Sequence, residues 1–143
     1  MRFFFFGTLM DEEVLALVVS YLPPPHDRRP AILSGYRRVK ARGVSYPVIV
    51  EAERSSVEGL LVSGLDRAAA ERLAAYEGAA YEAAEVTVSA AGRPHRALVF
   101  VPRPGGGLVP LDEDWHYEEW RRRHGATFVA RLRRWKTAER ASD

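Results

Sequence analysis

The stretch FFFFGTLMD, residues 3–11, decides how the chain begins to fold. Four consecutive aromatic residues closed by glycine are typical of a buried strand that ends in a tight turn. Acidic residues at 11–13 then precede apolar ones, which predicts a helix with negative charge at its positive amino-terminal end. Backbone amides in the turn lack an obvious partner and would attract anionic oxygen. A simple strand-to-helix turn, relieved sterically by Gly7, is the alternative.

The remaining chain alternates between strand and helix signals. Strands are predicted where β-branched or aromatic residues gather between turn residues, over 31–40, 47–52, 57–63, 81–89 and 95–101, with the polar stretch 53–56 as a separator. A second helix runs from the capping residue Asp66 to a stop at Gly78, and a third covers about 114–138, with an interruption at Gly125. The fold class is therefore α+β: a small, mostly antiparallel β-barrel with flanking helices and a C-terminal helix.

Composition limits the function classes. A length of 143 residues predicts one domain over 1–143. The absence of cysteine excludes disulfides and thiol nucleophiles, and the four histidines show no metal-ligand spacing, so neither a metal nor another cofactor is expected. We find no signal peptide and no apolar run long enough for a membrane span, so we expect a cytoplasmic protein without a membrane partner.

Basic residues crowd the segment 121–136, although the formal net charge is only +2. One interpretation is a surface for phosphate or nucleic acid. The other is a solvated helix face whose arginines lie against acidic neighbours. We favour the second, because no aromatic or glycine pattern of a nucleic-acid module accompanies the charges.

Glu77 is the candidate for acid–base chemistry. It lies directly before Gly78, at a helix end that disfavours negative charge and would raise the pKa of its carboxyl group toward the range of a general base. A charged residue at an ordinary helix end is the alternative. Tyr81 offers a phenolic donor nearby or simply begins a strand, and Tyr46 precedes Pro47, which opens a strand where proline is tolerated.

Four segments in this order resemble the γ-glutamylcyclotransferase-like family, also called AIG2-like. They are FFFFGTLMD at 3–11, SYP at 45–47, EGLLVSGLD at 58–66 and AAYEGAAYEAAEVTV at 74–88. The similarity runs from residue 2 to about 102, and the tryptophan-bearing C-terminal helix is similar to that of small bacterial members. The resemblance implies a compact β-barrel with a pocket in which a glycine turn faces a glutamate.

By the same resemblance Glu77 matches the catalytic acid/base. The substrate-binding positions are Phe6, Gly7, Thr8 and Leu9 in the turn, with Tyr46, Pro47 and Tyr81 as pocket walls. Tyrosine commonly occupies the position of Phe6, so this residue is a departure from the family pattern.

The activity implied is a cofactor-free cyclisation of a small-molecule substrate, a γ-glutamyl amide or related amide. It would yield 5-oxoproline and release an amine or amino acid. Two other readings stay open: a small-ligand-binding domain of the same fold with little or no catalysis, and a basic C-terminal helix that binds nucleic acid or protein. The sequence specifies neither the leaving amine nor the oligomeric state.

Overall fold

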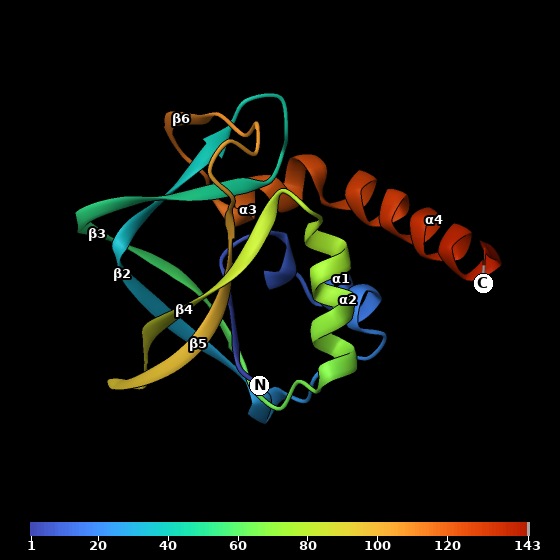
Figure 1. Cartoon of the computed structure of the whole chain (residues 1–143), viewed down its shortest axis with the longest axis horizontal. Coiled ribbons are helices and arrows are strands. Elements are labelled where there is room, and N and C mark those ends of the chain that lie inside the picture. Colours follow the sequence, from blue (N-terminus) through green and yellow to red (C-terminus); the bar gives the residue numbers. More distant parts are fainter. Residues whose placement is uncertain (143) are drawn as a thin grey trace.

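The structure, a computed structural model, describes residues 1–142 and the side chains of residues 1–139. Its strands are β1 (Phe3–Phe5), β2 (Arg28–Ala41), β3 (Pro47–Val62), β4 (Tyr81–Ala90), β5 (Arg93–Pro102) and β6 (Pro110–Asp114). They follow the order β3-β1-β5-β4-β2-β6, and β2 also pairs with β3. The first five strands therefore close into a barrel, with β6 added beside β2 (Figure 1). Only β1 and β5 run parallel within the described chain, so the predicted mostly antiparallel barrel is confirmed.

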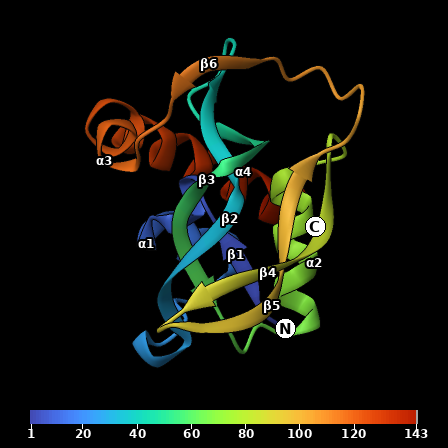
Figure 2. The same cartoon turned by 90° about the vertical axis from the view of Figure 1, so that its left-hand side faces the viewer.

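The helices gather on one side of the barrel. They are α1 (Glu12–Val19), α2 (Arg67–Glu77), α3 (Tyr117–Trp120) and α4 (Ala126–Ser142). In Figure 1, α1, α2 and α4 lie to the right of the strands, and in Figure 2, seen from the barrel side, α2 and α4 lie behind them. One layer of helices thus covers one part of the barrel wall.

The run of four phenylalanines places one strand between two cores. Successive side chains on a strand point to opposite faces. Phe3 and Phe5 pack into the core between barrel and helices. Phe4 and Phe6 pack into the core inside the barrel. Both faces of β1 are therefore buried, which explains why the segment shows no polar alternation.

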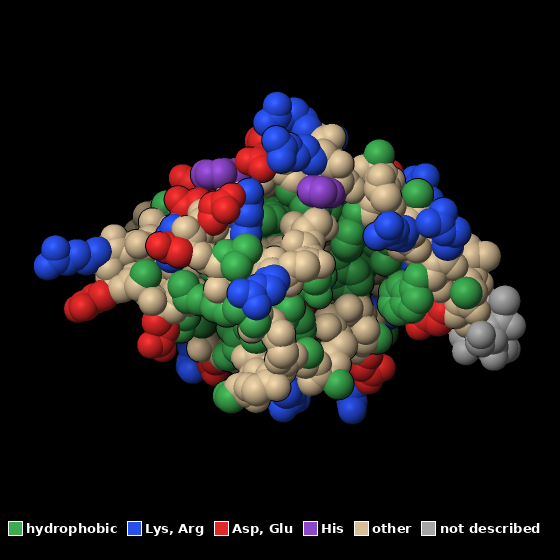
Figure 3. Space-filling view, turned by 90° about the horizontal axis from the view of Figure 1, so that it is seen from above, with side chains coloured by type: hydrophobic (Ala, Val, Ile, Leu, Met, Phe, Trp, Pro, Cys, Tyr) green, Lys and Arg blue, Asp and Glu red, His purple; other side chains and the backbone are tan. Residues whose placement is uncertain are grey.

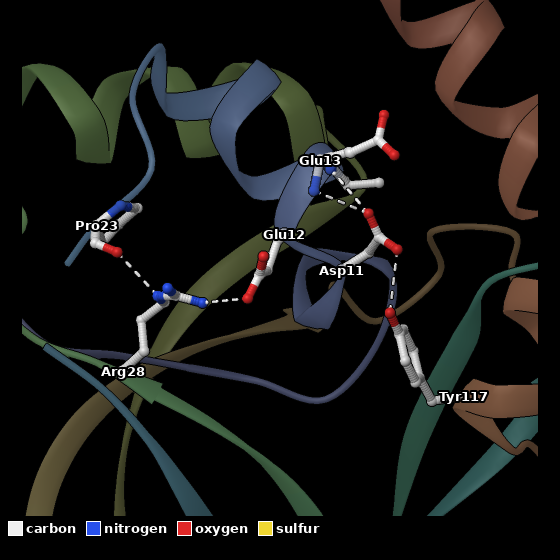
Figure 4. Close-up of polar contacts among 7 residues, drawn as sticks. Asp11, Glu12, Glu13, Pro23, Arg28 and Tyr117 are labelled. Carbon is white, nitrogen blue, oxygen red and sulfur yellow. Dashed lines mark hydrogen bonds and ion pairs between the residues drawn. The ribbon is translucent and has the colours of Figure 1, made fainter. Parts of the chain in front are cut away.

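Asp11 fixes the start of α1 and ties it to the C-terminal part of the chain (Figure 4). Its Oδ1 accepts hydrogen bonds from the amides of Glu13 at 3.0 Å and Val14 at 3.1 Å, which satisfies donors at the helix start. Its Oδ2 accepts one from the Tyr117 hydroxyl at 3.0 Å. Partial burial, with the Asp11 charge adding to it, raises the pKa of Tyr117 to about 12, so this phenol stays a donor.

The predicted break at residues 53–56 is wrong, because β3 continues through it as one strand. The polar residues fall where the pairing with β2 slips: Ser34 lies opposite Ser56, whereas Tyr36 lies opposite Glu51. The additional β3 residues stay extended across this irregularity, so their polarity marks a shift in register and not the end of a strand.

The C-terminal helix predicted over 114–138 begins later, because Asp114 is the last residue of β6 and residues 115–116 link that strand to the helix. Strand β6 is held against β2 by charge pairs: Arg37 Nε and Nη1 donate to Asp114 and Asp112 at 2.7 and 2.6 Å. Helix α3 starts only at Tyr117. The expected interruption is a five-residue π-helical turn that ends at Gly125, and α4 then continues to 142.

Candidate active site

A cavity of about 260 Å³ opens where the barrel wall separates next to α2. Strands β1 and β5 pair where Phe3 lies opposite Leu98. Within the described chain no later pair is formed between these two strands, and Phe5 and Phe100, which follow on them, line the cavity instead. The pocket is therefore a product of strand divergence.

The structure brings all eight sequence-predicted site residues to this one cavity. The residues are Phe6, Gly7, Thr8, Leu9, Tyr46, Pro47, Glu77 and Tyr81. They come from segments up to 75 positions apart in sequence, from β1 to the start of β4. What brings them together is the barrel, because β1 and β3 are neighbours and α2 leads directly into β4.

The glycine turn, residues 7–9, follows β1 and opens a short 3₁₀ helix over Thr8–Met10. Its carbonyls accept hydrogen bonds, from Met10 to Gly7 at 3.0 Å and from Asp11 to Thr8 at 3.1 Å. Within residues 1–142, the amides of the turn donate no hydrogen bond to the protein. These three donors are available to an anionic group in the cavity.

Position 7 requires glycine because the start of β3, at Pro47, lies close to it. A Cβ built on Gly7 would lie 3.1 Å from the Pro47 ring carbons, tighter than ordinary van der Waals contact. Pro47 begins β3, so the first strand of the chain and the start of β3 meet at this glycine. A side chain here would push the turn and the Tyr46 loop apart.

Thr8 is held by Tyr76. The Thr8 Oγ1 lies 2.7 Å from the Tyr76 hydroxyl, and either oxygen can be the donor. Thr8 is buried, and burial raises the pKa of Tyr76 well above its usual range, so the phenol stays neutral. This hydrogen bond joins the glycine turn to the last turn of α2, which carries Glu77.

Glu77 is the last residue of α2, and Gly78 ends the helix with φ of 84°. Its side chain is half-buried in the cavity wall, and no residue that the structure describes donates a hydrogen bond or forms an ion pair with its carboxylate. Burial raises the pKa of Glu77 from 4.5 to about 7. The sequence predicted such a rise from the helix end. In the structure the cause of the raised pKa is the loss of hydration of the buried carboxyl group.

Tyr81 and Tyr46 line the cavity together with Glu77. Burial, and then the neighbouring Glu77 carboxylate, raise the pKa of Tyr81 far above its usual range. Tyr46 faces the same cavity. The lining contains no lysine, arginine or histidine and no second acid. Glu77 is thus the one carboxyl group of the lining, and its pKa of about 7 lets it exchange a proton near neutral pH.

Buried side chains from the middle and the end of the chain fix the cavity wall. Ser45 accepts hydrogen bonds from two indoles, from Trp115 Nε1 to its carbonyl at 2.8 Å and from Trp120 Nε1 to its hydroxyl at 3.3 Å. Arg38 Nη1 donates to the Phe6 carbonyl at 2.9 Å, immediately before the glycine turn. The same atom donates to the Glu58 carbonyl at 2.8 Å, and burial lowers the pKa of Arg38.

Sequence reasoning missed the residues that complete the wall. They are Phe4, Phe5, Tyr76, Phe100 and Phe128. The phenylalanines of β1 carried only a strand signal, and Tyr76 could be suspected only as the neighbour of Glu77. Phe128 lies on α4, far along the chain, and nothing in its local sequence indicates a pocket.

Neither a metal centre nor a membrane span is evident in the described part of the chain. Within it, no group of three or more His, Asp or Glu side chains is arranged to hold a metal ion. Among residues 1–142 no helix combines the length and the apolar character that crossing a membrane requires.

Comparison with known protein families identifies the family of this chain. The profile of the gamma-glutamyl cyclotransferase, AIG2-like family matches residues 3–122. The chain belongs to this family. Family membership supplies the class of fold, and the matched range contains every predicted site residue.

Relatives within the AIG2-like family include plant proteins. Protein AIG2 C of Arabidopsis thaliana is 30% identical over 139 residues, which covers 92% of this chain and 78% of the relative. A solution structure of another A. thaliana protein superposes with a TM-score of 0.69 at 26% identity, covering 97% of this chain and 83% of that one. A structure named gamma-glutamyl cyclotransferase gives a TM-score of 0.60 at 11% identity, over 93% and 86% of the two chains. This last likeness concerns the fold alone.

Proposed function

We propose that the protein is a cofactor-free γ-glutamyl cyclotransferase that converts a γ-glutamyl amide to 5-oxoproline and releases an amine or amino acid. The observation that carries the proposal is one unpaired, half-buried carboxylate, Glu77, in the same cavity as three unpaired amides of the glycine turn. Glu77 is the proposed catalytic residue. The glycine turn, Phe6, Tyr46, Pro47 and Tyr81 would bind the substrate.

The charges of the cavity fit a γ-glutamyl group. Such a group carries an α-ammonium, an α-carboxylate and a γ-carbonyl within one short chain. The ammonium would lie against Glu77, the only ionisable acid of the lining. The turn amides would bind either the α-carboxylate or the oxyanion that develops on the γ-carbonyl oxygen.

The reaction needs no covalent enzyme intermediate, because the substrate carries its own nucleophile. Glu77 accepts a proton from the α-ammonium, and the freed amine attacks the γ-carbonyl carbon to close a five-membered ring. The C–N bond to the leaving group then breaks while Glu77 gives this proton to the departing nitrogen. Glu77 takes the second proton from the ring nitrogen and passes it to the released amine. Protons move one at a time from attacking to leaving nitrogen, with none consumed overall.

Positioning would also contribute to the rate. The cavity would hold the tethered amine and the γ-carbonyl carbon in a near-attack geometry and so restrict the conformers that cannot cyclise. The aromatic walls Phe5, Phe100 and Phe128 leave little room for extended conformers in a cavity of about 260 Å³. They also exclude water from the reacting groups.

The test is release of 5-oxoproline from a series of γ-glutamyl amines and dipeptides, followed by mass spectrometry. Since deprotonated Glu77 is the base and its pKa is about 7, kcat/KM should rise as the pH increases through about 7. A pH profile that is flat from about pH 5 to about pH 8 would contradict the role of Glu77.

A second candidate is a ligand-binding domain of the same fold without turnover. It is favoured by Phe6, where the family pattern commonly has tyrosine, because the missing hydroxyl removes one polar contact. Calorimetry with γ-glutamyl compounds would then record uptake without product. The basic C-terminal helix offers less support for a nucleic-acid surface, because Arg133 pairs with Glu13 at 3.0 Å and Arg123 with Glu119 at 3.7 Å.

A further inference from the structure

A second hollow adjoins the cavity on the side of α4. It has a volume of about 570 Å³ and lies between the loop at residues 43–46 and α4. Three residues line both spaces: Tyr46, Tyr76 and Phe128. We call this hollow the outer groove. It begins at the wall of the cavity that contains Glu77.

The outer groove is apolar at its base and basic at its edge. Its apolar lining comes from Val44, Leu132 and Trp135, and its polar lining includes His124 and Arg131, with no acidic residue. Figure 3 shows hydrophobic side chains in a hollow next to α4, with basic side chains and a histidine at its border. An uncompensated cation beside an apolar surface complements an anionic group on an apolar body.

Arg131 differs from Arg133 and Lys136 on α4. Arg133 bonds to Glu13, and Lys136 lies 3.9 Å from Glu139 and donates to the Val18 carbonyl at 3.4 Å. Arg131 forms no hydrogen bond and no ion pair with any residue of the described chain. Trp135, one helical turn further, exposes 39% of its surface. The Arg131 guanidinium is therefore available to a ligand. Trp135 offers the exposed part of its ring, beside the Lys136 ammonium that lies 5.6 Å from the ring centroid.

The geometry of the reaction requires a place for the leaving group. The cavity volume of about 260 Å³ is below the roughly 300–1,000 Å³ of ordinary ligand pockets, so it suits the γ-glutamyl half of a substrate alone. The scissile carbonyl must lie near Glu77, and the leaving nitrogen is one bond away from it. The departing half must extend past the shared wall formed by Tyr46, Tyr76 and Phe128.

We propose that the outer groove binds the departing half of the substrate and that this half is an amino acid with a large apolar side chain and a free α-carboxylate. The apolar side chain packs on Leu132 and Trp135, and the α-carboxylate pairs with Arg131. The inference rests on the proposed cyclotransferase function. It specifies the substrate class as γ-glutamyl dipeptides of hydrophobic amino acids.

Binding to the Glu77→Gln variant tests the groove without turnover. Three compounds are compared by calorimetry: γ-glutamylphenylalanine, γ-glutamylphenethylamine, which lacks the carboxylate, and γ-glutamylglycine, which lacks the ring. We expect the first to bind most tightly. Adding Arg131→Gln should weaken the two carboxylate compounds about fivefold and leave the phenethylamine unchanged.

The complementary change is Trp135→Ala, which should weaken the two ring compounds and leave γ-glutamylglycine unchanged. The matched control is Arg134→Gln, on the same helix but outside both hollows, and it should alter none of the affinities. Equal affinity for the three compounds, or an Arg131→Gln effect that does not depend on the carboxylate, overturns the inference.

Turnover by the wild-type chain separates this inference from the function on which it rests. Release of 5-oxoproline from all three compounds with equal kcat/KM supports the cyclotransferase and overturns the groove. Absence of 5-oxoproline from every compound, together with the expected binding pattern, refutes the cyclotransferase and supports the groove as a binding site for the same apolar amino acid.

Discussion

Replacing Glu77 by glutamine should abolish 5-oxoproline release and, above neutral pH, stabilise the protein. Glutamine has nearly the same shape as glutamic acid but carries no exchangeable carboxyl proton. Burial raises the pKa of Glu77 from 4.5 to about 7, so between these values the native state holds a proton that the unfolded chain has lost. The native state binds more protons in this window, and its stability therefore falls as the pH rises through it.

The magnitude follows from the two pKa values. At about 1.4 kcal/mol per pH unit, the interval from 4.5 to about 7 amounts to about 3 kcal/mol of unfolding free energy. Wild type should lose this amount between about pH 4 and about pH 8, and the Glu77→Gln variant should not. The variant should therefore exceed wild type by about 3 kcal/mol at the higher pH and differ little at the lower one.

Urea unfolding of both proteins at the two pH values measures the effect, and mass spectrometry of 5-oxoproline measures activity. The matched control is Glu71→Gln, an exposed carboxylate on the same helix, which should change stability little at either pH and leave turnover intact. The reasoning fails if the stability difference between wild type and Glu77→Gln is the same at both pH values. It fails equally if the variant retains full activity.

Three further changes test how the cavity wall is held. Arg38→Met removes the donors to the Phe6 and Glu58 carbonyls, so urea unfolding should record a loss of about 3 kcal/mol, whereas Arg37→Met on the exposed face should lose much less. Gly7→Ala introduces a Cβ at 3.1 Å from the adjoining proline ring, and we expect about 1–3 kcal/mol lower stability together with lower kcat/KM; unchanged kinetics would refute the close approach. Tyr76→Phe leaves the buried threonine hydroxyl of the glycine turn unpaired, so the free energy of unfolding should fall by about 1 kcal/mol and KM should rise. An unaltered KM would show that this hydrogen bond plays no part in substrate binding.

Local chemistry was sufficient to predict the elements that begin and end on strong signals. Asp66 caps α2 through a 2.8 Å hydrogen bond to the Ala69 amide, and Gly78 ends it, as the sequence indicated. The run of four phenylalanines was sufficient to predict β1, because a strand that is buried on both faces needs no polar residue. Strand β6 was missed because its acidic residues show no apolar alternation. Its partners on β2 lie about 70 positions or more away in sequence.

The candidate site could be predicted from the sequence only in part. Glu77 and the glycine turn could be named from residue type and placed opposite each other only through the family resemblance. Arg38 lies in the segment 31–40, which the sequence predicts only as a strand, although its guanidinium reaches three backbone carbonyls, those of Phe6, Glu58 and Trp115. Phe128 lines the cavity only because α4 packs beside it. Contacts of this kind depend on tertiary packing, for which a single sequence carries no local signal.

Helix α4 lies outside the family match but lines both the cavity and the outer groove. The family match ends at residue 122, and it includes the barrel, the glycine turn and Glu77, whereas Phe128, Arg131 and Trp135 come after it. The C-terminal segment would then supply one side of the leaving-group site, and the loop at residues 43–46, inside the family match, the other. A chimaera that carries the C-terminal helix of a relative on this barrel would alter the preferred leaving group through that one side, so specificity in such a protein would evolve in part by replacing a terminal segment.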